Sequence, residues 1–255
     1  MLGLLFMSDF TEAVKIITPL AAPLIKVLIE NVAVPAVKNA YQSISTAVKA
    51  EQIDVSEHFS EYLLRTYARL SFVNTLVFPN QQVKLIDIYV PLRIAPSDNR
   101  SFIHKVDKWK PDIIEKYGKM MLIDTAGMGK STLLKWFFLQ IVDSAYKIPI
   151  FLELRSIRSG KSIIDRIIED LSQFDRPFPR ELFLALMKNG NFVFLFDGYD
   201  EIALEERERV TGELQDFSAR SSENKLIISS RKDPALSCFG DFQAFFILPL
   251  RKEEV

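Results

Sequence analysis

A glycine-rich segment that ends in lysine, serine and threonine has the residue types that most clearly suggest chemistry. This segment, DTAGMGKST at residues 124–132, follows a short apolar run and precedes a segment with helical periodicity. In that setting glycines let the backbone turn so that N–H groups point at phosphate oxygens, and the helix N-terminus attracts an anion. Lys130 would reach the β- and γ-phosphates, and the Ser131 hydroxyl would bind Mg²⁺. We therefore predict a nucleotide-binding loop formed by Ala126, Gly127, Met128, Gly129, Lys130, Ser131 and Thr132.

Asp124 departs from the phosphate-loop pattern G-x-x-x-x-G-K-[ST], which has glycine at this position. The first glycine lies at the turn from strand to loop, where the shape of the backbone matters more than contact with phosphate. Aspartate tolerates turn conformations better than most residues. We expect the loop to bind nucleotide with the Asp124 carboxylate pointing away from it, and the effect on affinity stays open.

Acidic residues follow a second apolar run, NFVFLFDGYDE at residues 191–201. A carboxylate at the end of a buried parallel strand beside a phosphate loop is well placed to hold Mg²⁺, so Asp197 is predicted on the metal side with Ser131. Either Asp200 or Glu201 would deprotonate the attacking water. The alternative, a solvated loop after a strand, is less favoured because the GKST segment precedes it.

A third apolar run, KLIISSR at residues 225–231, ends in two serines and an arginine. It would place Arg231 near a γ-phosphate, although a surface ion pair explains this residue equally well. A second G-K-S sequence in residues 158–163 lacks an upstream glycine-bearing loop. We interpret it as a loop leading into a helix.

The elements that must position these residues differ along the chain. From Lys119 onward short apolar runs alternate with segments of helical periodicity, which predicts a parallel sheet covered on both faces. Residues 1–72 read as a small helical domain, with two or three helices broken near Pro19, Pro23 and Pro35 and another at residues 55–70. Residues 73–118 are expected to be an extended linker and a helix leading into the core at 119–255.

Composition excludes several classes of function. The chain has 255 residues, a net charge of −1, one cysteine and two histidines. This gives no electrostatic sign of nucleic-acid binding, and Cys238 alone can form neither an internal disulfide nor a multi-cysteine zinc site. No uninterrupted apolar stretch reaches the roughly 20 residues of a membrane span. A cytoplasmic protein fits these features.

Five segments together resemble the NACHT domain of signal-transduction (STAND) P-loop ATPases, the NLR-like proteins of innate immunity that in bacteria serve in anti-phage defence. They are DTAGMGKSTLLKWF, IPIFLELRSI, VFLFDGYDEI, KLIISSR and FFILPLRKEEV. The acidic signature DGYDE is the most specific of them, since most other P-loop ATPases lack this form. The upstream segment NTLVFPNQQVKLIDIYVPL is also similar, so the resemblance extends from about residue 74 to the end.

The resemblance implies a parallel five-stranded sheet in the order 5-1-4-3-2, with strands numbered from residue 119, preceded by the helical domain. It implies ATP or ADP with Mg²⁺, slow hydrolysis, and a switch that is closed with ADP and self-associates with ATP. By position, Lys130 and Ser131 would hold phosphate and metal, Asp197 the metal, Asp200 or Glu201 the water, and Arg231 would sense the γ-phosphate. It also implies an unknown trigger, for which a phage component is one candidate, and further domains beyond Val255, so that this chain would be a fragment.

Two other functions stay open. Asp124 and the missing domains would leave a nucleotide-binding scaffold with little turnover. Alternatively, the N-terminal helices act on membranes under control of the ATPase, which Lys26, Lys38 and Lys49 permit, although such charges usually mark a solvated face.

Overall fold

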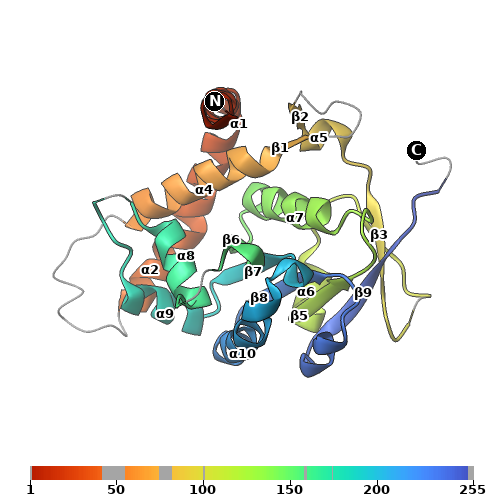
Figure 1. Ribbon diagram of the computed structural model, residues 1–255. Helices are drawn as coiled ribbons and strands as arrows, with labels where there is room; N and C mark the ends of the chain where they lie inside the picture. Colours follow the sequence, from red (N-terminus) through yellow and green to blue (C-terminus); the bar gives the residue numbers. More distant parts are fainter. Residues whose placement is uncertain are drawn as a thin grey trace.

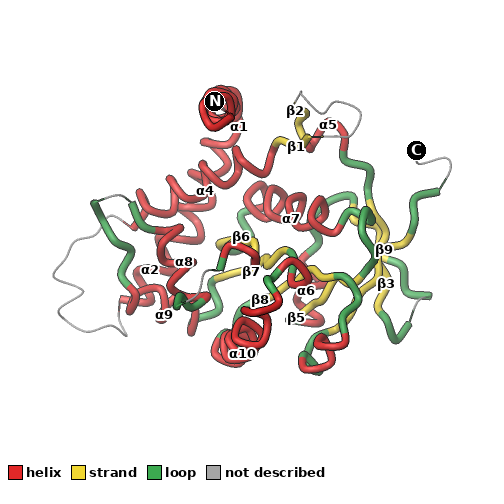
Figure 2. Tube along the Cα trace, viewed as in Figure 1, coloured by secondary structure: helices red, strands yellow, loops and turns green. Residues whose placement is uncertain are grey.

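The structure is a computed structural model, and it describes residues 2–41, 55–74, 82–99, 101–157, 160–173 and 175–251. A twisted sheet runs through the molecule, with α7 (Lys130–Ser144) on one face and α10 (Leu204–Arg220) on the other (Figures 1 and 2). The N-terminal helices α1, α2 and α4 gather at the β6 end of the sheet, while β3 and β9 lie at the opposite end.

Seven strands form the main sheet, in the order β4-β3-β9-β5-β8-β7-β6. Neighbouring strands from β9 to β6 pair in parallel, whereas β3 pairs antiparallel with both β9 and β4. The strands are β3 (Leu92–Pro96), β4 (His104–Val106), β5 (Lys119–Ile123), β6 (Ile148–Glu153), β7 (Phe192–Asp197), β8 (Lys225–Ser230) and β9 (Gln243–Leu248).

The predicted five-stranded sheet is therefore wrong in its number of strands. The five parallel strands do follow the order 5-1-4-3-2, but β3 and β4 extend the sheet beyond β9. Both added strands come from residues 73–118, which were expected to be an extended linker, and they cover the edge of β9 that would otherwise be exposed. They were missed because each has five residues or fewer and β3 ends in a proline, which is typical of a sheet margin.

Among the other described residues between 72 and 118 are a small two-stranded sheet and two short helices. The sheet pairs β1 (Phe72–Asn74) with β2 (Gln82–Lys84), and the helices are α5 (Leu85–Ile88) and α6 (Pro111–Tyr117). α6 leads directly into β5, as the sequence predicts for a helix before the core.

The helices of the core lie between its strands along the chain, and α8 begins at a clear capping signal. They are α7 (Lys130–Ser144), α8 (Ile163–Leu171), α9 (Arg180–Lys188) and α10 (Leu204–Arg220), with short 3₁₀ turns at η2 (Leu154–Ser156), η3 (Tyr199–Glu201) and η4 (Pro234–Cys238). Ser162 and Asp165 form a reciprocal capping box at the start of α8. The second G-K-S sequence is thus confirmed as the entrance to a helix.

The N-terminal helices differ from the prediction. α1 (Leu2–Leu28) continues through Pro19 and Pro23, and a π-helical turn, η1 (Ile29–Ala33), joins it to α2 (Val34–Tyr41) without a break. The expected breaks at prolines are wrong because the helix adapts to them. At the turn before Pro35, the Val34 N–H bonds to the Ile29 carbonyl five residues back, a widening that accommodates the proline ring.

One helical stretch, Lys15–Tyr41, is long and apolar enough to cross a membrane by length and composition alone. The sequence analysis expected no apolar stretch of this length, whereas the helix continues through the charged residues that interrupt the apolar run. Part of this stretch is packed inside the molecule, where Ala21, Leu28 and Ala40 are fully buried. A buried helix of a folded core meets the same criterion.

Helix α4 (Val55–Ser71) covers the other margin of the sheet, along β6. The Phe151 N–H on β6 donates to the Tyr62 hydroxyl over 2.9 Å, and His58 Nδ1 donates to the Leu171 carbonyl at the end of α8 over the same distance. Buried residues of α1, α4 and the sheet belong to one continuous apolar cluster. The division of the chain at residues 72 and 118 into separate domains stays a prediction.

Candidate nucleotide-binding site

The loop between β5 and α7 has the backbone shape that the glycines predict. Gly127 and Gly129 have φ angles of +80° and +87°, in the left-handed region that side chains disfavour. A Cβ atom on Gly129 would also lie 3.0 Å from a methyl carbon of Leu92 on β3. The positive φ therefore favours glycine at position 129, and a larger residue would also need the Leu92 side chain to shift slightly; the helix starts directly after it at Lys130.

Lys130 is held across this loop. Its Nζ donates to the carbonyl oxygens of Asp124 at 3.0 Å and Thr125 at 2.8 Å, and only 9% of the residue is exposed. Burial lowers the pKa of Lys130, while the carboxylates of Asp200 and Asp124 act in the opposite direction. The ammonium group is thus largely withdrawn from water at the place where an anion would sit.

Asp124 uses its carboxylate to fix the backbone. Oδ1 accepts from the Thr125 N–H at 2.7 Å, and Oδ2 accepts from the Ile247 N–H on β9 at 3.1 Å. The parallel pairing of β5 with β9 reaches Leu122 and Phe245, so the side chain continues this pairing where the main chain turns away. These contacts agree with a carboxylate that does not face the nucleotide.

Ser131 and Asp197 meet at the ends of α7 and β7. The Ser131 hydroxyl donates to Asp197 Oδ1 over 3.0 Å. The Ser229 hydroxyl donates to the same oxygen and accepts from the Gly198 N–H at 2.9 Å, which fixes Asp197 from the end of β8. The sequence analysis noted Ser229 only as one of two serines at the end of an apolar run. Its bond to Asp197 spans 32 positions along the chain, and no local pattern announces it.

These two oxygens fit the ligand sphere of Mg²⁺. Adjacent ligands of an octahedral Mg²⁺ at about 2.1 Å lie about 3.0 Å from each other, close to the Ser131–Asp197 separation. Within the described part of the chain no group of three His, Cys, Asp or Glu residues could hold a metal ion. A phosphate-loop site needs none, because nucleotide oxygens and water supply the other ligands.

The acidic turn after β7 presents its two carboxylates differently. Both Asp200 oxygens are engaged by Arg231, through its N–H at 2.9 Å and through Nε at 3.0 Å. The Glu201 side chain is 45% exposed and forms an ion pair with Arg155 at 3.1 Å. Arg207 of α10 supports the turn by donating to the carbonyl oxygens of Asp200 and Ile202. The sequence reasoning missed Arg155 and Arg207, which act through partners on other elements.

A cleft of about 280 Å³ joins these parts, just below the range of roughly 300–1,000 Å³ that is typical of small-molecule pockets. Of the predicted site residues, Met128 and Asp197 lie outside its lining. The described residues that line it are Ala126, Gly127, Gly129, Lys130, Ser131, Thr132, Gly198, Asp200, Glu201, Ser229 and Arg231. Residues predicted from three separate segments of the sequence thus share one polar cleft.

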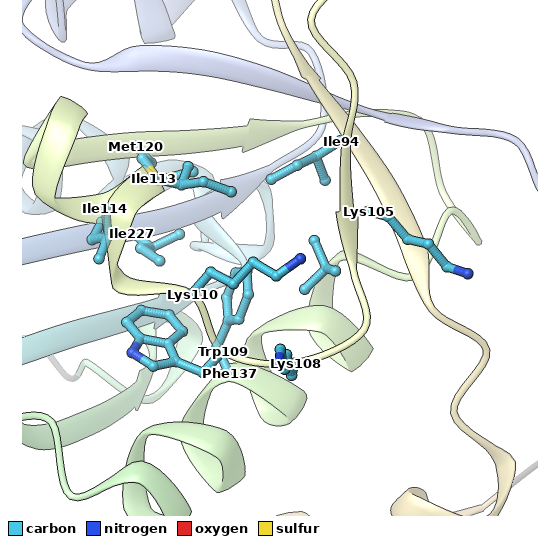
Figure 3. Close-up of a pocket in the computed structure, with 11 residues that line it drawn as sticks. Ile94, Lys105, Lys108, Trp109, Lys110, Ile113, Ile114, Met120, Phe137 and Ile227 are labelled. Atoms are coloured by element: carbon cyan, nitrogen blue, oxygen red, sulfur yellow. The ribbon is translucent and has the colours of Figure 1, made fainter.

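A second cavity shares no lining residue with this cleft (Figure 3). Apolar side chains such as Ile94, Met120 and Phe137 surround it, and Lys105, Lys108 and Lys110 lie around it. Its volume of about 20 Å³ is room for about one water molecule. In this conformation it cannot take a nucleotide.

Comparison with known proteins adds the family. The NACHT domain model matches residues 119–255. A search of curated proteins found no match. Among solved structures, "Structure of C. elegans PCH-2" aligns with a TM-score of 0.32 and 14% identity over 53% of this chain. The aligned part spans 36% of that protein's length, about a third.

The NACHT match covers more than half of the chain and includes the phosphate loop, the acidic turn and the strand that ends at Arg231. The chain therefore belongs to the NACHT family, and its core is a nucleotide-binding P-loop NTPase domain.

Proposed function

We propose that the protein binds ATP or ADP with Mg²⁺ in the 280 Å³ cleft and hydrolyses ATP slowly, as a conformational switch. The observation that carries this proposal is the contact of Ser131 with Asp197 beside the withdrawn ammonium group of Lys130. Phosphate would replace the Asp124 and Thr125 carbonyls as partner of Lys130, and the loop amides would donate to the same phosphate oxygens. Ser131 and Asp197 would hold Mg²⁺, which neutralises phosphate charge when it is bound.

Glu201 is our candidate for the residue that takes the proton of the attacking water. Asp200 is less suited to this role because Arg231 engages both of its carboxylate oxygens. We assign Asp200 to positioning Arg231, whose guanidinium group lines the cleft and would contact the γ-phosphate.

The switch itself rests on the difference between ATP and ADP. Nucleotide biases a conformation only if it binds two conformations unequally, and the γ-phosphate is the group available for that difference. Self-association, control of an effector in anti-phage defence and a phage-derived trigger follow from the NACHT resemblance and complete the proposal. The cytoplasmic location that we also propose follows from the composition.

Two observations favour other functions. The ion pair of Glu201 with Arg155 favours a nucleotide-binding scaffold with little turnover. The apolar helical stretch Lys15–Tyr41 favours action of the N-terminal helices on membranes. Measurable ATP hydrolysis would contradict the first of these, and intact dye-filled liposomes after addition of the protein with ATP would contradict the second.

Thermal unfolding with and without Mg-ATP tests the site. A ligand that binds only the folded state at about 100 times its Kd stabilises the protein by about 2.7 kcal/mol. We expect Lys130→Ala to lose this gain. Lys161→Ala is the matched control, because Lys161 belongs to the second G-K-S sequence and pairs with Glu169 away from the cleft. Equal stabilisation of all three proteins would refute the site. Glu201→Gln should keep the gain and lose hydrolysis.

A further inference from the structure

A row of four alternating charges connects helix α4 to the acidic turn of the cleft. Arg69 Nη1 lies 3.1 Å from Glu153 Oε1 at the end of β6. Arg155 Nη2 lies 2.8 Å from Glu153 Oε2, and Arg155 Nη1 lies 3.1 Å from Glu201 Oε2. The proposed nucleotide chemistry uses only the last of these residues. The other three form a path from the N-terminal helices to that residue.

Arg69 is tied to the position of α4 on β6. Its guanidinium carbon lies 5.7 Å from the ring centre of Phe151, the β6 residue whose N–H donates to Tyr62 of α4. Helix α4 thus contacts β6 through a hydrogen bond from one turn and, about two turns further on, through a ring face and an ion pair. A shift of α4 along or away from β6 would separate Arg69 from Glu153.

The two inner residues of the row are each shared. Glu153 pairs with Arg69 and Arg155, and Arg155 pairs with Glu153 and Glu201. Loss of one partner leaves charge uncompensated and strengthens the pair on the other side. Arg69 therefore weakens the attraction of Glu153 for Arg155, which leaves Arg155 more available to Glu201.

We propose that Arg155 is a positioning residue that restrains Glu201, and that α4 sets this restraint through Arg69 and Glu153. The proposal rests on the proposed function, in which Glu201 accepts the proton from water. When α4 withdraws Arg69, Glu153 draws Arg155 toward itself and Glu201 is released into the cleft. The N-terminal helices thereby control turnover without touching nucleotide.

The test is the sign of the effect along the row. Labelling of Glu201 with carbodiimide and glycine ethyl ester, located by mass-spectrometric fragmentation, reports how freely this carboxylate reacts. We expect faster labelling in Arg155→Gln, slower labelling in Glu153→Gln, and a smaller increase in Arg69→Gln. Since exposed ion pairs are weak, each change should be about 1.5-fold to fivefold. It should shrink in about 1 M salt, where the screening length falls to about 3 Å.

Arg65→Gln is the matched control on the same helix. The Arg65 side chain is 43% exposed against 47% for Arg69, and it contacts Glu61 and the Asp170 carbonyl outside the row. Glu201 should be labelled in Arg65→Gln at the same rate as in the parent protein. Equal labelling in all variants, or a change in Glu153→Gln of the same sign as in Arg155→Gln, would overturn the proposal.

The kcat for ATP hydrolysis should rise in Arg155→Gln and Arg69→Gln and fall in Glu153→Gln, as the labelling rate does. The KM should not change, because Arg69, Glu153 and Arg155 lie outside the lining of the cleft. A kcat that falls in all three variants would overturn the regulatory role. Labelling requires no nucleotide, so failure to bind or hydrolyse ATP counts against the proposed function and not against the row of charges.

Discussion

At the scale of single residues, Asp124 shows how a departure from a motif is accommodated. Its carboxylate accepts N–H groups from the loop and from β9, so it replaces a backbone contact. In Asp124→Ala the N–H of Ile247 loses its acceptor. Ile247 is itself only 2% exposed, so water cannot readily replace the lost bond. A buried donor without a partner costs about 1–3 kcal/mol, which we expect as the loss in free energy of unfolding.

Urea unfolding followed by circular dichroism measures this loss. Asp124→Asn should lose less, because its amide oxygen still accepts one bond. Asp241→Ala is the control, since the Asp241 side chain is 58% exposed and surface substitutions usually change stability by less than about 0.5 kcal/mol. If Asp124→Ala is as stable as this control, the bond to β9 contributes nothing.

At the scale of elements, the contact between α4 and α7 contains a half-buried carboxyl group. The Tyr67 hydroxyl donates to Asp143 Oδ1 at 3.1 Å, and Gln140 Nε2 donates to Oδ2 at 3.4 Å. Burial raises the pKa of Asp143, and the bond from Tyr67 opposes this only in part. An acid with a raised folded-state pKa costs stability once the pH rises above its unfolded pKa.

Asp143→Asn should therefore raise the melting temperature at pH 7, because the amide keeps the bond from Tyr67 and has no charge to desolvate. The gain should vanish as the pH falls below the unfolded pKa of about 3.9, where both forms are neutral. Calorimetric melting between pH 3.5 and pH 8 measures the difference. A gain that persists at the acidic end would assign it to packing instead of charge.

Elements also show what sequence can and cannot predict. The five parallel strands were predictable because each is a continuous apolar run beside a helix, as in FVFLF before Asp197. The added strand β3 was not, since it joins the sheet through β9, about 150 residues further along the chain, and β4 joins the sheet only through β3. The phosphate-loop motif and the strand before Asp197 predicted that Ser131 and Asp197 both hold the metal; this role stays a prediction, and the structure adds the hydrogen bond between them across 66 positions. The partners Arg155 and Arg207 depend on tertiary packing, which no local pattern encodes.

At the scale of the molecule, the N-terminal helices and the sheet share one apolar cluster. Removal of residues 1–71 would uncover β6 at Phe151 and Glu153 and leave the Phe151 N–H without the Tyr62 hydroxyl. An uncovered strand at the edge of a sheet pairs readily with other chains. We expect the shortened protein to aggregate, which light scattering during size-exclusion chromatography would show.

A monomeric shortened chain with the melting temperature of the parent would show instead that residues 1–71 are an independent unit.

The central strand β5 pairs on both sides with strands that come much later in the chain, β8 and β9. Asp124 completes its carboxylate contacts only when Ile247 is in place. During synthesis at the ribosome, the GKST segment emerges more than a hundred residues before this last partner. A nascent chain should consequently acquire nucleotide affinity late and abruptly, so that unfinished polypeptides cannot respond to ATP.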